Sequence, residues 1–249
     1  MTLGVFHWSK DNRSGAEASI ESFKTQNPGI DYFLVCDGGV SYADICSKYG
    51  VSYFHSKYNI GYPSSYGRGN WGYDSVHVEL FLKRILLACR KLEVDHMVIS
   101  EDDVICLNPI QYNPKFAIQS YWVTDGNLLH PKLLEYLTTD DFKPNQPHYG
   151  AGAGTIIDTQ IFIHNYSEMN WYLTKHFDRH HKDYNYQLGW NDCFLTVFFY
   201  LAQKHYHENP RLHNIWPENP NTDLKELAKH YDMVHNYKNY YEDRKLKNV

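Results

Sequence analysis

The sequence lacks the features of a disulfide-rich, membrane-spanning or secreted protein. Its five cysteines are odd in number and form no Cys-x-x-Cys pair, which favours free thiols in a reducing compartment. No apolar run approaches the roughly 20 residues of a membrane span. The stretch Met1–Phe6 reads as a strand, without the charged start and apolar core of a signal peptide. A soluble, cytoplasmic protein is therefore expected.

The sequence also lacks a large excess of positive or negative charge. The chain has 24 Lys and Arg against 29 Asp and Glu, a net charge of -5, and no long basic run, so a nucleic-acid partner is not expected. Aromatic residues are abundant, with 22 Tyr and 6 Trp. Such rings suit clefts that hold sugars or bases, although most of them fill ordinary cores.

The chain of 249 residues, 43% of them hydrophobic, can build one large core. Strand-like and helical apolar patterns alternate in its first half, which is typical of a parallel sheet with right-handed crossovers. We expect an α/β fold with a mostly parallel central sheet flanked by helices. A single domain, 1–249, would combine a regular half, 1–108, with a more irregular half, 109–249. The expected elements of the first half are strands at 3–6, 32–36, 51–54 and 97–99 and helices at 16–23, 42–49 and 75–92.

Three consecutive acids follow the last of these strands. The apolar run Met97–Ile99 predicts a buried strand, and Glu101, Asp102 and Asp103 would lie at its carboxyl end, the edge where open α/β sheets bind ligands. Adjacent carboxylates repel one another unless a cation offsets the charge, and hard divalent cations take such ligands together with phosphates. The hypothesis is a metal–diphosphate site; the alternative is an acidic turn.

Two glycine-rich segments also indicate ligand contact. The loop 57–73 contains four glycines and Arg68, and loops of this length are usually functional. The small residues at 150–154 lead into β-branched residues, which predicts a loop against a ligand and then strand structure that includes Thr159–Ile163. Further on, Trp190 and Asn191 precede an expected helix at 192–205.

This order of elements resembles the nucleotide-sugar-dependent glycosyltransferases of the GT-A fold. The resemblance covers about residues 1 to 205 and rests on short motifs. The acidic motif departs from a strict Asp-x-Asp because Glu comes first. The matching segments are Tyr58-Asn59-Ile60-Gly61, Arg68 with Asn70, the long helix, Val98–Asp103, Gly150–Gly154 and Trp190-Asn191-Asp192.

The resemblance implies a sugar transferred from a nucleoside-diphosphate sugar to a hydroxyl of a glycan or glycoconjugate, with Mn²⁺ or Mg²⁺ at the diphosphate. Residues 1–108 would bind the donor and 109–249 the acceptor. Asp103 would bind the metal, while Glu101 or Asp102 would orient the ribose or support the metal through water.

A histidine near the end of the chain would complete the metal site in this resemblance. The candidates are His213, His230 and His235. We favour His235, because Lys238 close to it could also reach a phosphate.

The same resemblance assigns further residues to the donor. Arg68 would pair with the diphosphate through its planar guanidinium. Asp37, His7 and Trp8 follow the first two strands, where the family holds its nucleobase. Two of them have an ordinary alternative: Arg68 as an exposed loop residue and Asp37 as a turn residue before two glycines.

Asp192 is the expected general base, since inverting members of the family place a carboxylate at this point, near the acceptor. The alternative is a helix N-cap. Residues expected beside the acceptor or the donor sugar are Gly150, Ala151, Gly152 and Trp190.

Two other functions fit the same scaffold. A nucleotidyltransferase that makes nucleotide sugars would need a glycine-rich basic loop after the first strand, and residues 7–13 contain no glycine. A non-catalytic carbohydrate or nucleotide-sugar binder is compatible with the many aromatic residues. It would have no need for the acids at 101–103 and 192.

Overall fold

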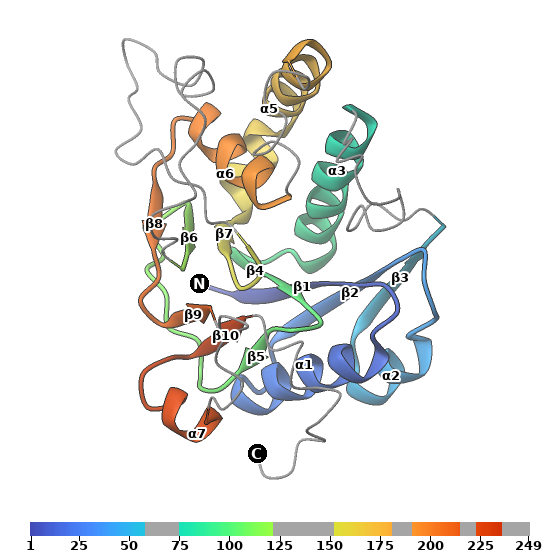
Figure 1. The fold of residues 1–249 in the computed structure, drawn as a ribbon, viewed down its shortest axis with the longest axis vertical. Coiled ribbons are helices and arrows are strands. Elements are labelled where there is room, and N and C mark those ends of the chain that lie inside the picture. The colour runs from blue at the N-terminus through green and yellow to red at the C-terminus, as the bar shows by residue number, and fades with distance from the viewer. Residues whose placement is uncertain (58–74, 122–151, 181–190, 215–222, 236–249) are drawn as a thin grey trace.

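The computed structural model describes residues 1–57, 75–121, 152–180, 191–214 and 223–235. In this part of the chain a seven-stranded sheet lies between two layers of helices (Figure 1). Its strands are β1 (Leu3–Ser9), β2 (Asp31–Asp37), β3 (Ser52–Ser56), β4 (His96–Glu101), β6 (Ile118–Ser120), β7 (Ile156–Asp158) and β8 (Tyr206–Glu208).

The sheet is mostly parallel. Its strand order is β3-β2-β1-β4-β7-β6-β8, and every neighbouring pair is parallel except those made by β7, which runs antiparallel to β4 and to β6. The expected α/β class and the alternating units of the first half are confirmed. The chain's second half contributes β6, β7 and β8 to the same sheet.

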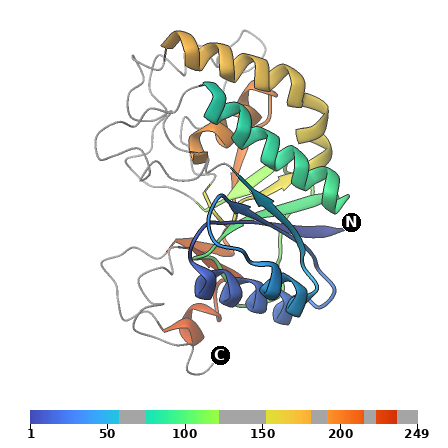
Figure 2. The same ribbon diagram turned by 90° about the vertical axis from the view of Figure 1, so that its right-hand side faces the viewer.

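Helices cover both faces of the sheet (Figure 2). One face carries α3 (Ser75–Leu92), α5 (Thr159–His180) and α6 (Asn191–Leu201), and the other carries α1 (Arg13–Gln26) and α2 (Ala43–Tyr49). Strand β1 shows the two-residue period that this arrangement requires, since Phe6 and Trp8 pack toward α3 while Val5 packs toward α1. None of the described helices is long and apolar enough to cross a membrane.

The expected strand at Thr159–Ile163 is wrong, because α5 begins at Thr159. The carboxylate of Asp158 accepts a hydrogen bond from the Ile161 amide at 2.9 Å, which satisfies a free donor of the first helical turn. The β-branched residues favoured a strand, but the apolar residues that follow have helical spacing, with Phe162, Met169 and Leu173 buried. The Asp-Thr pair was the missed signal for a helix start.

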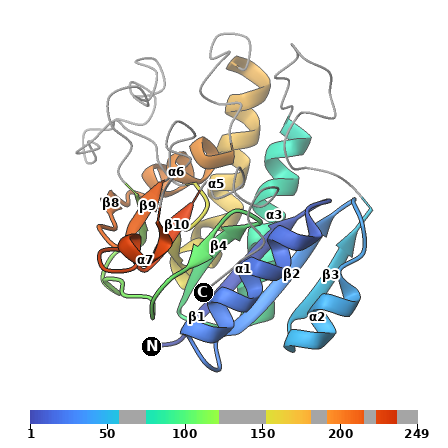
Figure 3. The same ribbon diagram turned by 60° about the horizontal axis from the view of Figure 1, so that its bottom comes forward.

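A second, small sheet lies beside α1 (Figure 3). Its order is β5-β10-β9, and it consists of β5 (Ile105–Cys106), β9 (Leu212–Asn214) and β10 (Met233–His235), with the short helix α7 (Leu224–Leu227) before β10. Ile105 and Val234 are buried together with Ala18 of α1. This contact holds the small sheet against α1, and β5 follows the three acids directly in the sequence.

The buried carboxylate of Asp232 anchors β10. Its Oδ1 accepts hydrogen bonds from the Arg211 Nη2 and Nε atoms at 2.6 and 3.1 Å, and its Oδ2 accepts one from the Gln111 amide at 2.8 Å. The Asp232 carbonyl accepts from the Leu107 amide at 2.7 Å. One residue thus ties β10 to the chain before β9 and to the segment after β5.

We expect Asp232→Ala to lower the free energy of unfolding by about 3 kcal/mol, because it leaves the Arg211 guanidinium and a buried amide without their acceptor. Urea denaturation measures the loss. As a control, Asp223→Ala removes an exposed cap of α7 and should cost less than about 1 kcal/mol. Equal losses in the two variants would contradict the anchoring role of Asp232.

Candidate functional site

The strand order places a topological switch point between β1 and β4. From β1 the chain continues through β2 to β3 on one side, and β4 pairs with β1 on the other side. Ligands of open α/β sheets bind at the carboxyl ends of the strands beside such a point. Here the carboxyl ends bring Trp8 opposite Glu101 in the parallel register.

The three acids form a tight turn at this edge. The Val104 amide donates to the Glu101 carbonyl at 3.1 Å, so Asp102 and Asp103 occupy the centre of the turn. Glu101 and Asp103 belong to one group of side chains, while Asp102 is bonded to His7 of β1 at 3.0 Å. The turn thus separates the three carboxylates into a pair and a single residue with its own partner.

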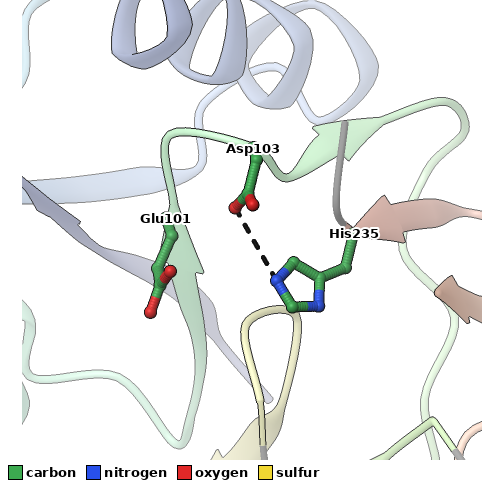
Figure 4. A group of neighbouring side chains, drawn as sticks. All are labelled: Glu101, Asp103 and His235. Carbon is green, nitrogen blue, oxygen red and sulfur yellow. Dashed lines mark ion pairs between the residues drawn. The ribbon is translucent and has the colours of Figure 1, made fainter. Parts of the chain in front are cut away.

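His235 completes the pair into a cluster of three. In the antiparallel ladder of β10 with β5, Val234 lies opposite Ile105, so the next residue of β10 reaches the chain just before β5. The His235 Nε2 atom lies 3.7 Å from the Asp103 Oδ1 atom (Figure 4). One ligand atom from each of Glu101, Asp103 and His235 lies within 4.8 Å of the others.

The other two candidate histidines lie elsewhere. His213 stacks on Tyr231 with ring centroids 4.6 Å apart, and burial lowers the pKa of its imidazole. His230 is exposed and lies 4.0 Å from Glu226. Within the described ranges, His235 is the histidine that joins the acids.

The donor set suits a hard or borderline divalent cation. Carboxylates suit Mn²⁺ and Mg²⁺, while an imidazole suits borderline ions such as Zn²⁺ and Fe²⁺. The Asp103 side chain is fully buried, and burying a carboxylate charge is costly unless it is paired. Two atoms bound to one ion at about 2.1 Å lie roughly 3.0 to 4.2 Å apart. The 3.7 Å separation of His235 and Asp103 falls within this range, and the Glu101 carboxylate lies within 4.8 Å of both.

Asp37 at the end of β2 faces Arg84 of α3, a residue that no sequence motif singled out. Its Oδ1 lies 3.5 Å from the Arg84 Nη2 atom, and Asp37 is fully buried. The same Nη2 donates to the Ser56 hydroxyl, and the Arg84 guanidinium lies over the Phe54 ring, 5.6 Å from its centroid. Burial lowers the pKa of Arg84. This group joins α3 to the carboxyl ends of β2 and β3.

His7 and Trp8 are both buried. Both ring nitrogens of His7 contact protein groups, Tyr32 and Asp102. The Trp8 side chain is 8% exposed and stacks on Phe81 of α3, with centroids 5.2 Å apart. Its indole N–H has no hydrogen-bond partner among the described residues. In this structure the two residues fill the interior on opposite faces of β1.

Gly152 lies beside the end of β4. Its carbonyl accepts from the Thr155 amide at 3.1 Å, and the Gly154 amide donates to the Ile99 carbonyl at 2.6 Å. Asp192 is in the first turn of α6, and its side chain is outside the described part of the structure. The remaining expected residues, Arg68, Gly150, Ala151 and Trp190, lie outside the described residues.

We expect Trp8→Ala to lower the free energy of unfolding by about 3–5 kcal/mol, because it removes a large ring from a packed core. Trp171→Ala is the matched control, since that indole is 56% exposed and its loss should cost no more than about 0.5 kcal/mol. Urea denaturation compares the two. A stable Trp8→Ala protein would show that this ring faces a cleft instead.

Comparisons with known proteins agree with the fold. No family model and no curated protein sequence matches the chain. Among solved structures, the chain is similar to the galactosyltransferase LgtC in complex with donor and acceptor sugar analogs. The TM-score is 0.51 and the sequence identity 11%, over 93% of this chain and 86% of that one. The likeness supports the expected GT-A-like fold with a mostly parallel central sheet flanked by helices.

Proposed function

We propose that this chain is a glycosyltransferase that moves a sugar from a nucleoside-diphosphate sugar to a hydroxyl of a glycan or glycoconjugate. The observation that carries the proposal is the convergence of Glu101, Asp103 and His235 at the switch point of the sheet. A non-catalytic carbohydrate binder has no need to bring two carboxylates and an imidazole together. The galactosyltransferase with the similar fold was solved with donor and acceptor sugar analogs, which supports a similar pair of ligands here.

In the proposed site, Glu101, Asp103 and His235 hold Mn²⁺ or Mg²⁺. The bound ion supplies positive charge that offsets the leaving diphosphate. Asp102 is not proposed as a ligand because its carboxylate contacts His7. The sequence allowed either Glu101 or Asp102 to support the metal, and we propose Glu101 for this role.

The donor's other contacts remain sequence-based proposals. Arg68 would pair with the diphosphate, and Asp37 would lie against the nucleobase. For Asp37 the neighbourhood is polar and rigid, since Arg84 and Ser56 adjoin it at the carboxyl ends of β2 and β3. Gly150, Ala151, Gly152 and Trp190 would line the sugar-binding part, where Gly152 adjoins the end of β4 through its hydrogen-bonded turn.

We expect Mn²⁺ and a nucleoside diphosphate together to raise the melting temperature more than either alone, because a ligand that binds only the folded state stabilises it. At a hundred times its dissociation constant, a ligand adds about 2.7 kcal/mol. The measurement is a thermal shift with UDP, GDP and dTDP, each with and without Mn²⁺. No shift with any of them would contradict a nucleotide-sugar donor.

Asp103→Asn tests the cation site with a side chain of the same shape. It should abolish the Mn²⁺-dependent shift and the hydrolysis of the donor sugar, because a buried amide is a poor ligand in place of a carboxylate. The control is Asp31→Asn, an exposed acid at the opposite end of β2, which should keep both. A full Mn²⁺ response in Asp103→Asn would remove Asp103 from the site.

Asp192 is proposed as the general base of an inverting reaction, from its place at the start of α6. We expect Asp192→Asn to lower transfer about 10²- to 10⁴-fold while Mn²⁺ and nucleotide binding persist. NMR of the product should show an anomeric configuration opposite to that of the donor. A product with the donor's configuration would overturn the role of Asp192 as inverting base.

A further inference from the structure

A line of buried hydrogen bonds crosses three neighbouring strands under the acidic turn. Tyr32 of β2 contacts His7 of β1, with its hydroxyl 2.6 Å from the His7 Nδ1 atom. The His7 Nε2 atom lies 3.0 Å from the Asp102 Oδ1 atom, at the end of β4. His7 is fully buried, so both ring nitrogens have a defined partner within the protein.

For a neutral His7 ring, the two partners assign one tautomer. The Asp102 carboxylate accepts, so the Nε2 atom carries the hydrogen that faces it. Burial raises the pKa of Tyr32, which keeps its hydroxyl protonated and able to donate to the Nδ1 atom. A ring held between an acceptor and a donor has one orientation.

The backbone of Asp102 is held as well. A methyl group at Gly15 would lie 2.8 Å from the Asp102 carbonyl oxygen, so the first turn of α1 packs directly against the acidic turn. The Asn12 side chain accepts from the Gly15 amide at 3.0 Å and fixes where α1 begins. Asp102 is therefore confined by His7 through its side chain and by α1 through its peptide.

Confining Asp102 determines where its neighbours point. Three consecutive carboxylates repel one another, and a turn with free side chains would spread them in different directions. Because Asp102 is bonded to His7 on the inner side, Glu101 and Asp103 are left on the side that faces His235. Because Asp102 is held away from His235, Glu101 and Asp103 are the two acids that meet the histidine.

We propose that His7 is a positioning residue for the cation site, acting through Asp102 to hold Glu101 and Asp103 toward His235. This inference rests on the proposed function in that it takes the cluster to bind a divalent cation. It assigns His7 a structural task under the site instead of a contact with the nucleobase. Residues that orient metal ligands in this way typically change metal affinity 10- to 100-fold when they are lost.

The matched pair His7→Asn and His7→Gln tests the proposal. Both side chains end in the same amide, but only glutamine is long enough to place a donor where the imidazole Nε2 atom lies. The dissociation constant of Mn²⁺, without nucleotide, is measured by electron paramagnetic resonance of the free ion. We expect His7→Asn to bind Mn²⁺ about 10- to 100-fold more weakly and His7→Gln within about 3-fold of the unchanged protein.

Tyr42→Phe is the control for a simple loss of stability. The Tyr42 hydroxyl accepts a hydrogen bond from the Ser9 hydroxyl at 2.5 Å. Ser9 lies two residues after His7 on the same face of β1. Removal of the Tyr42 hydroxyl should lower the melting temperature and leave the Mn²⁺ affinity unchanged. If His7→Asn does not fold, His7→Leu provides the same comparison with an apolar side chain.

The possible outcomes distinguish the positioning role of His7 from the cation site itself. Equal Mn²⁺ affinity in His7→Asn and the unchanged protein, or equal weakening by asparagine and glutamine, would overturn the positioning role and leave the cation site intact. Absence of Mn²⁺ binding by the unchanged protein would overturn the cation site itself, and the positioning role with it.

Discussion

The short ladder between β5 and β10 is the constraint on which the candidate site depends. It joins two strands from distant parts of the chain through the pairs of Met233 with Cys106 and Val234 with Ile105. Closing so long a loop costs conformational entropy, which the buried contacts of the small sheet and the bonds of Asp232 offset. Without this ladder the main sheet would still present acids at its edge, but no imidazole beside Glu101 and Asp103.

Strands β1 to β4 and the helices between them were predictable because their patterns are local. Strands covered on both faces read as apolar runs, and α3 follows from one apolar stripe at helical spacing. Helix α5 was not expected, because the β-branched residues after β7 also suit a strand. Strand β10 was not expected, since three residues carry too little pattern.

The candidate site was predictable in its residue types and only partly in its pairings. The acids at a strand end and a late histidine were readable from the sequence, and His235 was the favoured one of three. The division of the acids into Glu101 and Asp103 on one side and Asp102 on the other could not be read from the sequence. It depends on His7, which the register of β1 and β4 brings close to Asp102. The contact of Asp37 with Arg84 likewise requires the packing of α3 on the sheet.

The position of β10 near the end of the described chain has a consequence for biosynthesis. A nascent chain can form β1 to β4 and present Glu101 and Asp103 long before residue 235 has been made. Domains generally acquire their full set of contacts only when the whole unit has emerged. The third member of the proposed cation site therefore arrives last, and a growing or truncated chain would carry Glu101 and Asp103 without His235.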